Sequence, residues 1–171
     1  MASYEVAYIW MMLNEDGPQP FKYRTVPDVG GQAISGINSK YYPDQFAAIN
    51  AMAPGERGPA VEAFYLAEFW NKWFDQIVSD EVAKRVLDAA VNMGPGTAVR
   101  LLQAALNDCG ALGLTVDGAW GPHTVGETNQ ADSVNLVAAF KACRCQHYQD
   151  IADNDPSKEQ YLAGWLARAD K

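Results

Sequence analysis

Apolar residues recur at spacings of three and four along most of the chain, which is the period of an amphipathic helix. In the first segment the stripe comprises Val6, Ile9, Trp10 and Leu13, with Ser3 as the expected N-cap. This stripe is predicted to face the core. The same period predicts helices over residues 3–14, 59–77, 79–93, 97–109 and 133–152, and a last helix that begins at Pro156.

The helical period breaks between residues 21 and 42, where glycine and proline replace the apolar repeat. Such residues favour turns and a short hairpin. A second break, at residues 117–122, is typical of a tight turn around Trp120. The sequence therefore predicts a mainly α-helical fold with a small irregular or β-hairpin insert near the N-terminus. The residues that define this insert are Pro27, Gly30, Gly31, Gly36 and Pro43.

Charge and composition narrow the class of partner. The 171 residues include 13 Lys and Arg against 21 Asp and Glu, a net charge of −8. This charge opposes binding to nucleic acid or to an anionic membrane surface. The chain contains no apolar run long enough to span a bilayer, and its first ten residues lack the basic lead of a signal peptide. A monomer without nucleic-acid partner or membrane insertion is expected.

The residues also argue against metal and nucleophile chemistry. Cys143, Cys145 and His147 are close in sequence, but Cys145 lies about 200° from Cys143 around a helix. One ion could not gather all three. Three cysteines do not form a disulfide framework, and the common serine-nucleophile, phosphate-loop and zinc motifs are missing. Chemistry based on carboxylates, without metal or cofactor, is therefore expected.

Glu15 is the first candidate carboxylate. It lies where the first helix stops, roughly opposite the apolar stripe at about 100° per residue, so it is expected to point away from the core. The helix dipole and the adjacent Asp16 disfavour negative charge there. Both favour the neutral acid that a general acid needs. A solvated surface glutamate is the alternative interpretation.

Two further features suit a sugar site. The pair Gly30 and Gly31 allows positive φ or a close approach to a ligand, although a plain hairpin turn explains the pair equally well. Aromatic residues are frequent between positions 65 and 74, and include Trp70. Their helical spacing assigns most of these rings to the core, while one or two could form the floor of a sugar site.

Together these features resemble glycoside hydrolase family 108, whose members are lysozyme-like N-acetylmuramidases. The likeness is carried by Glu15, the glycine-rich block at residues 28–37, Phe69-Trp70, and the sequence DAAVNMG at residues 88–94. The resemblance implies a lysozyme-like helical fold, with a catalytic region over residues 1–94.

The second half is similar to the peptidoglycan-binding-like region that accompanies this family. The similarity is carried by DGAWGPHT at residues 117–124 and by the ending YLAGWLAR at residues 161–168. The resemblance implies a peptidoglycan-binding-like helical region over residues 95–171, packed with the first region as one compact unit. Bacterial peptidoglycan is the implied partner.

The resemblance implies that Glu15 is the catalytic acid. Asp28 is expected to be the second carboxylate, which holds a water or stabilises positive charge at the sugar. Asn92 contacts sugar or, alternatively, caps carbonyls near the end of its helix. The expected substrate-binding residues are Gly30, Gly31, Gly36, Trp70 and Asn92.

Two motifs depart from the family pattern at this end of the chain. The family sequence EGGY reads EDGP at residues 15–18, and Ala33 occupies the threonine position of the following motif. A methyl group cannot hydrogen-bond a water or a sugar. Thr25 or Ser35 could supply the missing hydroxyl.

Three hypotheses follow from these residues. The first is hydrolysis of the β-1,4 bond between N-acetylmuramic acid and N-acetylglucosamine in the cell wall. The second is a catalytically weakened or inactive peptidoglycan-binding module. The third is a transglycosylase-type lyase, which needs one glutamate. The expected setting is synthesis in the bacterial cytoplasm and action on the periplasmic wall, in phage lysis or in a secretion process.

Overall fold

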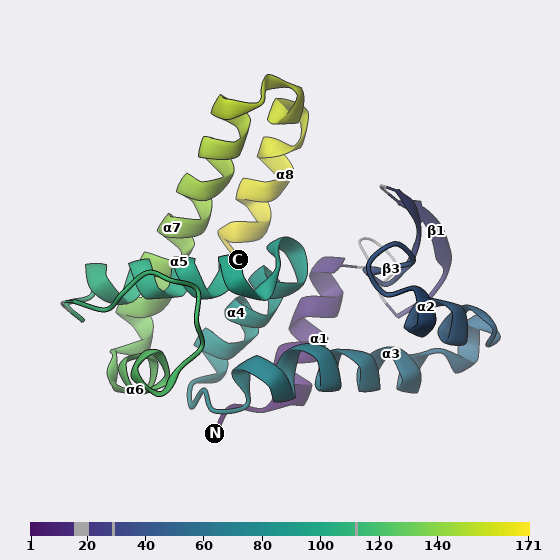
Figure 1. Ribbon diagram of the computed structural model, residues 1–171, viewed down its shortest axis with the longest axis horizontal. Helices are drawn as coiled ribbons and strands as arrows, with labels where there is room; N and C mark the ends of the chain where they lie inside the picture. The colour runs from purple at the N-terminus through teal and green to yellow at the C-terminus, as the bar shows by residue number, and fades with distance from the viewer. Residues whose placement is uncertain (16–20, 29, 112) are drawn as a thin grey trace.

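The computed structural model describes residues 1–15, 21–28, 30–111 and 113–171 (Figure 1). Within these ranges the chain is mainly helical with a small antiparallel sheet, which confirms the predicted fold class. The α-helices are α1 (Tyr4–Glu15), α2 (Pro43–Asn50), α3 (Gly58–Tyr65), α4 (Asp80–Met93), α5 (Pro95–Asp108), α6 (Pro122–Gln130), α7 (Ser133–Asn154) and α8 (Glu159–Ala169).

The predicted insert is a three-stranded meander. Its strands β1 (Thr25–Asp28), β2 (Gly31–Ile34) and β3 (Ile37–Asn38) pair in the order β1-β2-β3. Ser35 and Gly36 join β2 to β3 with φ values of 47° and 84°. Positive φ at both central residues is the mark of a tight hairpin turn that matches the strand twist.

Three helical predictions differ from the structure. The helix predicted over residues 59–77 is α3 followed directly by a π-helix, η2 (Leu66–Phe74). Helices α2 and α6 were not predicted, because Pro43 and Pro122 were interpreted as turn residues. Proline is equally suited to the first position of a helix, and both prolines begin a helix here.

The buried face of α1 is the opposite of the predicted one. Val6, Ile9 and Leu13 are 44%, 42% and 50% exposed. The prediction failed because α1 is apolar on both sides, so periodicity alone could not choose between the faces. The buried residues are Ala7, Tyr8, Met11 and Met12.

This correction also moves Glu15. At about 100° per residue, Glu15 lies at the centre of the face that carries Tyr8, Met11 and Met12. It therefore points toward the interior side of the helix and not away from it. The last turn of α1 thus directs a carboxylate inward at the point where the packed core ends.

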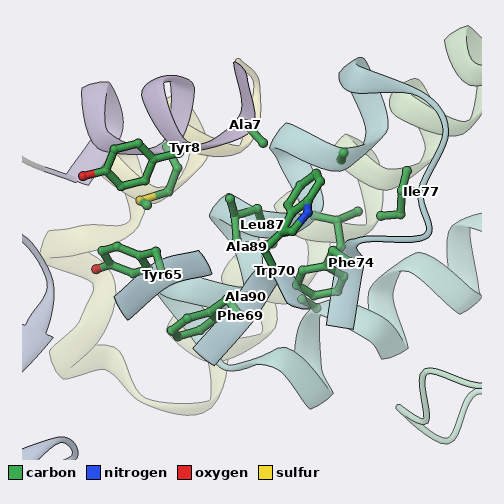
Figure 2. Close-up of a cluster of buried hydrophobic side chains, with 14 of the residues drawn as sticks. Ala7, Tyr8, Tyr65, Phe69, Trp70, Phe74, Ile77, Leu87, Ala89 and Ala90 are labelled. Carbon is green, nitrogen blue, oxygen red and sulfur yellow. The ribbon is translucent and has the colours of Figure 1, made fainter. Parts of the chain in front are cut away.

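Helix α4 is the central element of the fold. It contacts α1, α5, α7 and η2, and eight of its fourteen residues are buried. Figure 2 shows part of this core, in which Ala89 and Leu87 of α4 lie near the rings of Trp70 and Phe74. The end of α4 reaches the same side of the molecule as the end of α1.

Helices α7 and α8 form an antiparallel pair that projects from the other helices, and the end of α8 returns to α4 and α5 (Figure 1). Asp132 caps α7 by accepting a hydrogen bond from the Asn135 amide, as its position predicts. Pro156 begins the short 3-10 turn η3 (Pro156–Lys158), so α8 starts three residues later than predicted. Tyr161, predicted to face inward, is 50% exposed.

Candidate active site

A pocket of about 640 Å³ opens where α1 ends. The end of β1 and the β2–β3 turn border it on one side, and the last turn of α4 borders it on another. Four of the predicted site residues line it, from four different elements of the fold. These are Glu15, Asp28, Gly36 and Asn92.

The Glu15 side chain is only 17% exposed and lies directly over Gly36. A Cβ atom added at Gly36 would lie 3.0 Å from Glu15 Cγ and Oε1, and 2.8 Å from the Tyr65 hydroxyl. Only glycine leaves this space free, and the positive φ of Gly36 requires glycine as well. The turn between β2 and β3 is therefore shaped around the carboxylate.

An ion pair fixes the other side of Glu15. Arg168 Nη2 donates to Glu15 Oε2 at 2.6 Å, although the two residues are 153 positions apart. The expectation that the helix dipole and Asp16 favour a neutral Glu15 did not include this contact with a guanidinium. The neighbour Asp16, part of that expectation, lies outside the described residues.

Arg168 belongs to a four-residue charged cluster. Its Nη2 also donates to Asp88 Oδ1 at 2.9 Å, and Arg144 Nη2 donates to Asp88 Oδ2 at 2.9 Å. Asp88 is fully buried and Arg144 is 1% exposed. With Glu15 ionised, the two arginines and two carboxylates sum to zero charge. Burial lowers the pKa of Arg168, but the paired carboxylates of Glu15 and Asp88 raise it above its usual value, so this guanidinium stays charged.

The second predicted carboxylate, Asp28, ends strand β1. It accepts a hydrogen bond from Asn38 Nδ2 at 2.7 Å, and Asn38 Oδ1 in turn accepts from the Lys40 amide at 2.7 Å. Asn38 also lines the pocket. The hairpin therefore orients Asp28 through a side chain of β3, which the motif analysis did not identify.

Tyr65 is a further pocket residue that the sequence did not single out. Its hydroxyl donates to the Ser35 carbonyl at 2.6 Å and so holds the β2–β3 turn. Burial, and then the negative charge of Glu15, raise the pKa of Tyr65 well above its usual value. The hydroxyl therefore stays neutral and remains a donor. At helical spacing it was indistinguishable from the core aromatic residues.

Asn92 is oriented by a residue of α7. The buried Tyr148 hydroxyl donates to Asn92 Oδ1 at 2.5 Å, and the Tyr148 ring stacks on Trp165 with centroids 5.3 Å apart. Burial raises the pKa of Tyr148, so its hydroxyl keeps the proton that it donates. Because the side-chain oxygen is engaged, the amide nitrogen of Asn92 is the group suited to a ligand carbonyl.

Other predicted site residues lie elsewhere. Gly30 and Gly31 form the β1–β2 turn and pack against Lys40 and Ser39, outside the pocket lining. Trp70 is 5% exposed and packs in the core, where its ring centroid lies 5.5 Å from that of Tyr4. A ring this deeply buried does not present a face to the pocket.

The threonine position of the family motif is also distant from the pocket surface. Ala33 is 4% exposed and pairs with Asn38 across the sheet. The Thr25 hydroxyl donates to Asn50 at 2.6 Å, and the Ser35 hydroxyl is buried without a partner in the described part of the chain. Neither hydroxyl lines the pocket.

The described residues contain no group of three His, Cys, Asp or Glu side chains that could hold a metal ion. Within the same ranges, no helix is long and apolar enough to cross a membrane.

Comparison with known proteins finds two family matches. Residues 22–94 match the family described as Glycosyl hydrolase 108. Residues 97–170 match a second family, described as a predicted peptidoglycan domain. Together the two matches support hydrolysis or binding of peptidoglycan.

A solved structure of Brucella abortus SagA is similar to the chain. The two are 21% identical, with a TM-score of 0.70, over 98% of this chain and 89% of that one. At this identity the likeness shows a shared fold. None of the curated proteins matches the chain. Glu15 precedes the residues matched by the family, so its role has to be argued from the pocket itself.

Proposed function

We propose that the protein is an N-acetylmuramidase that hydrolyses the β-1,4 bond between N-acetylmuramic acid and N-acetylglucosamine in peptidoglycan. The observation that carries the proposal is the position of Glu15, a mostly buried carboxylate that lines the pocket of a chain whose residues 22–94 match family 108. Mostly buried carboxyl groups in a cleft are the usual general acids of glycoside hydrolysis.

In the proposed reaction the protonated Glu15 donates its proton to the glycosidic oxygen as the bond from that oxygen to the sugar carbon breaks. Water adds to the same carbon and loses a proton, which leaves one new reducing end for each bond cleaved. Asp28 serves as the second carboxylate, held by Asn38, and either orients the water or stabilises the positive charge on the sugar.

The rest of the pocket is suited to a sugar chain. The aromatic residues Tyr41, Tyr42, Phe64 and Phe69 line it, and aromatic rings pack well against the apolar faces of sugars. Asn92 adds a donor that is suited to the carbonyl of an N-acetyl group. A mostly apolar wall with a few placed polar groups is the usual composition of a ligand pocket.

The two halves of the chain are proposed to have different roles. Residues 1–94 form the catalytic region, and residues 95–171 form the peptidoglycan-binding-like region packed against it. The close contacts of α4 with α5 and α7 support this arrangement, because they join the two halves through one core. A monomer is the proposed active form.

The test is digestion of purified peptidoglycan by the wild type, by Glu15→Gln and by a matched control, Glu5→Gln. Glu5 is an exposed residue in the first turn of the same helix. We expect Glu15→Gln to reduce the release of reducing ends by at least about 100-fold, because a carboxamide cannot act as the acid. Glu5→Gln should match the wild type.

Equal activity of Glu15→Gln and wild type would remove Glu15 from the mechanism. A wild-type protein that sediments with peptidoglycan but releases no reducing ends would be a binding module and not a hydrolase. Thermal unfolding of each variant checks that the protein is folded before its activity is compared.

A further inference from the structure

We propose that Arg168, in the last helix of the peptidoglycan-binding-like half, is a positioning residue of the active site. It sets the orientation of Glu15. This inference rests on the proposed role of Glu15 as the general acid. It assigns the end of the chain a part in the reaction, beyond the binding of peptidoglycan that the second family describes.

The contacts of the Arg168 guanidinium carry the inference. Nη2 is shared between Glu15 Oε2 at 2.6 Å and Asp88 Oδ1 at 2.9 Å, while Nε lies 3.2 Å from both oxygens of Asp88. The side chains of Arg168 and Glu15 are 16% and 17% exposed, and that of Asp88 is fully buried. Arg168 thus bridges a structural carboxylate and the carboxylate of the pocket.

Contact with Glu15 and Asp88 at the same time requires the planar guanidinium group of an arginine. A guanidinium presents several donors in a fixed plane, whereas a lysine ammonium is a single charged point on a flexible stem. At this position a lysine could contact one of the two carboxylates but could not reproduce the planar contact with Asp88 and the bond to Glu15 together. The geometry therefore predicts that arginine and lysine are not equivalent here.

Further hydrogen bonds anchor the end of α8, so the backbone that carries Arg168 is held in place. Arg85 Nη2 on α4 donates to the Lys171 carbonyl at 2.6 Å. Lys171 Nζ donates to Asn14 Oδ1 at 2.7 Å, one residue before Glu15. Lys141 on α7 also donates to the Asp170 carbonyl. Three helices thus hold the segment that carries Arg168, which is the kind of support that a preorganised site needs.

Charged groups from several elements surround this contact. Arg168 faces Glu15 from α8, with Asp88 of α4 and Arg144 of α7 behind, and Tyr65 of α3 beside it stays neutral. Asp28 of β1 lines the same pocket.

The proposed reaction needs the Glu15 side chain in one place beside the glycosidic oxygen. Without the guanidinium, Glu15 loses the contact that holds its Oε2, so the maximum rate should fall while substrate binding is kept. A residue with a purely structural role would lower the folded fraction without changing kcat of the folded enzyme.

The experiment measures kcat and KM on soluble peptidoglycan chains for the wild type, Arg168→Met and Arg168→Lys. Arg100→Met, a change of an exposed arginine on α5, is the control for loss of one positive charge. For Arg168→Met we expect kcat of the folded protein to fall by at least about 10-fold, with KM within about twofold. Arg168→Lys should also lose kcat, because it keeps the charge but not the planar contacts.

Wild-type kcat in Arg168→Met, with Glu15→Gln inactive, would overturn the role of Arg168 and leave the proposed function intact. An inactive wild type, or a fully active Glu15→Gln, would instead overturn the proposed function. If Arg168→Met does not fold, Arg168→Lys decides, because it keeps the charge beside Asp88. Wild-type kcat in a folded Arg168→Lys would contradict the requirement for a planar guanidinium at this position.

Discussion

Two buried polar networks join distant parts of this chain, and they differ in charge and in setting. Around Gln103, Nε2 donates to Asp117 at 2.9 Å and to Thr124 at 3.1 Å, while Oε1 accepts from the Gly118 amide at 2.8 Å. This network spans at most 21 positions and closes the turn before α6. The cluster of Glu15 and Arg168 spans 153 positions and borders the pocket.

This difference favours a structural role for the Gln103 network and the proposed catalytic role for the cluster of Glu15 and Arg168. The Gln103 side chain is buried and binds a partly exposed turn, in which the charged Asp117 remains in contact with water. The Glu15 cluster keeps four charges partly or fully out of water, and such ion pairs are often no more stabilising than apolar residues of similar size. Charges retained at the edge of a pocket are therefore better explained by chemistry than by stability.

The largest expected effect comes from closing the space above Gly36. In Gly36→Ala the new methyl would meet Glu15 and Tyr65 at 3.0 Å or less, in a backbone conformation with φ of 84°. We expect hydrolysis to fall by about 100-fold, because a displacement of the acid by about 1 Å is enough for that loss. Rates of reducing-end release measure the effect, with Gly164→Ala, an open position on α8, as control.

Gln103→Met should lower the stability of the protein and leave its kcat unchanged. It removes the hydrogen bonds that the buried Gln103 makes to Thr124 and to the partly exposed turn, which should lower the free energy of unfolding by about 2 kcal/mol. The kcat of the folded fraction should stay at the wild-type value. Denaturant unfolding and kinetics on the same sample test this, with the exposed Gln160→Met as control. A large loss of kcat without loss of stability would contradict a purely structural role for the Gln103 network.

Tyr148→Phe tests a smaller link between the two halves of the chain. The change keeps the ring that stacks on Trp165 and removes the hydroxyl that orients Asn92. We expect KM to rise by about threefold with little change in kcat, because one hydrogen bond to a binding residue is lost. Tyr161→Phe, at an exposed position on α8, should behave as the wild type. An unchanged KM would argue against substrate contact by Asn92.

The smallest expected effect is that of salt. The chain carries a net charge of −8, and cell-wall polymers carry negative groups, so their encounter is opposed by repulsion. Moderate salt should raise activity by less than about threefold through KM, because it screens exposed charges. The mostly buried pair of Glu15 and Arg168 is screened less, so kcat should hardly change. A steady fall in activity from low salt upward would contradict this.

The sequence predicted what local patterns encode. Pro and Gly located the hairpin, the helical period located α7, and the family motifs located Glu15 and Asp28 beside one pocket. Local patterns were insufficient where two different packing arrangements agree with the same spacing of apolar residues. Helix α1 is apolar on both faces, so spacing could not show that Val6, Ile9 and Leu13 are exposed and that Glu15 points inward.

The supporting residues of the site were beyond local patterns. Arg168 meets Glu15 only because α7 and α8 return the chain to the end of α4. Tyr65 has the spacing of a core aromatic residue, and only the fold brings its hydroxyl to the turn beside Glu15. Trp70 shows the reverse, since its aromatic character suggested a sugar site and its position is in the core.

The central claim is that Glu15 catalyses hydrolysis of the muramyl bond. Mass spectrometry of the fragments released from purified peptidoglycan, after reduction with borohydride, tests it most directly. The account predicts fragments that end in reduced N-acetylmuramic acid from the wild type, and none from Glu15→Gln. Fragments that end in the anhydro sugar would show a lyase, and reduced N-acetylglucosamine ends would show cleavage of the other glycosidic bond; either result would contradict the claim.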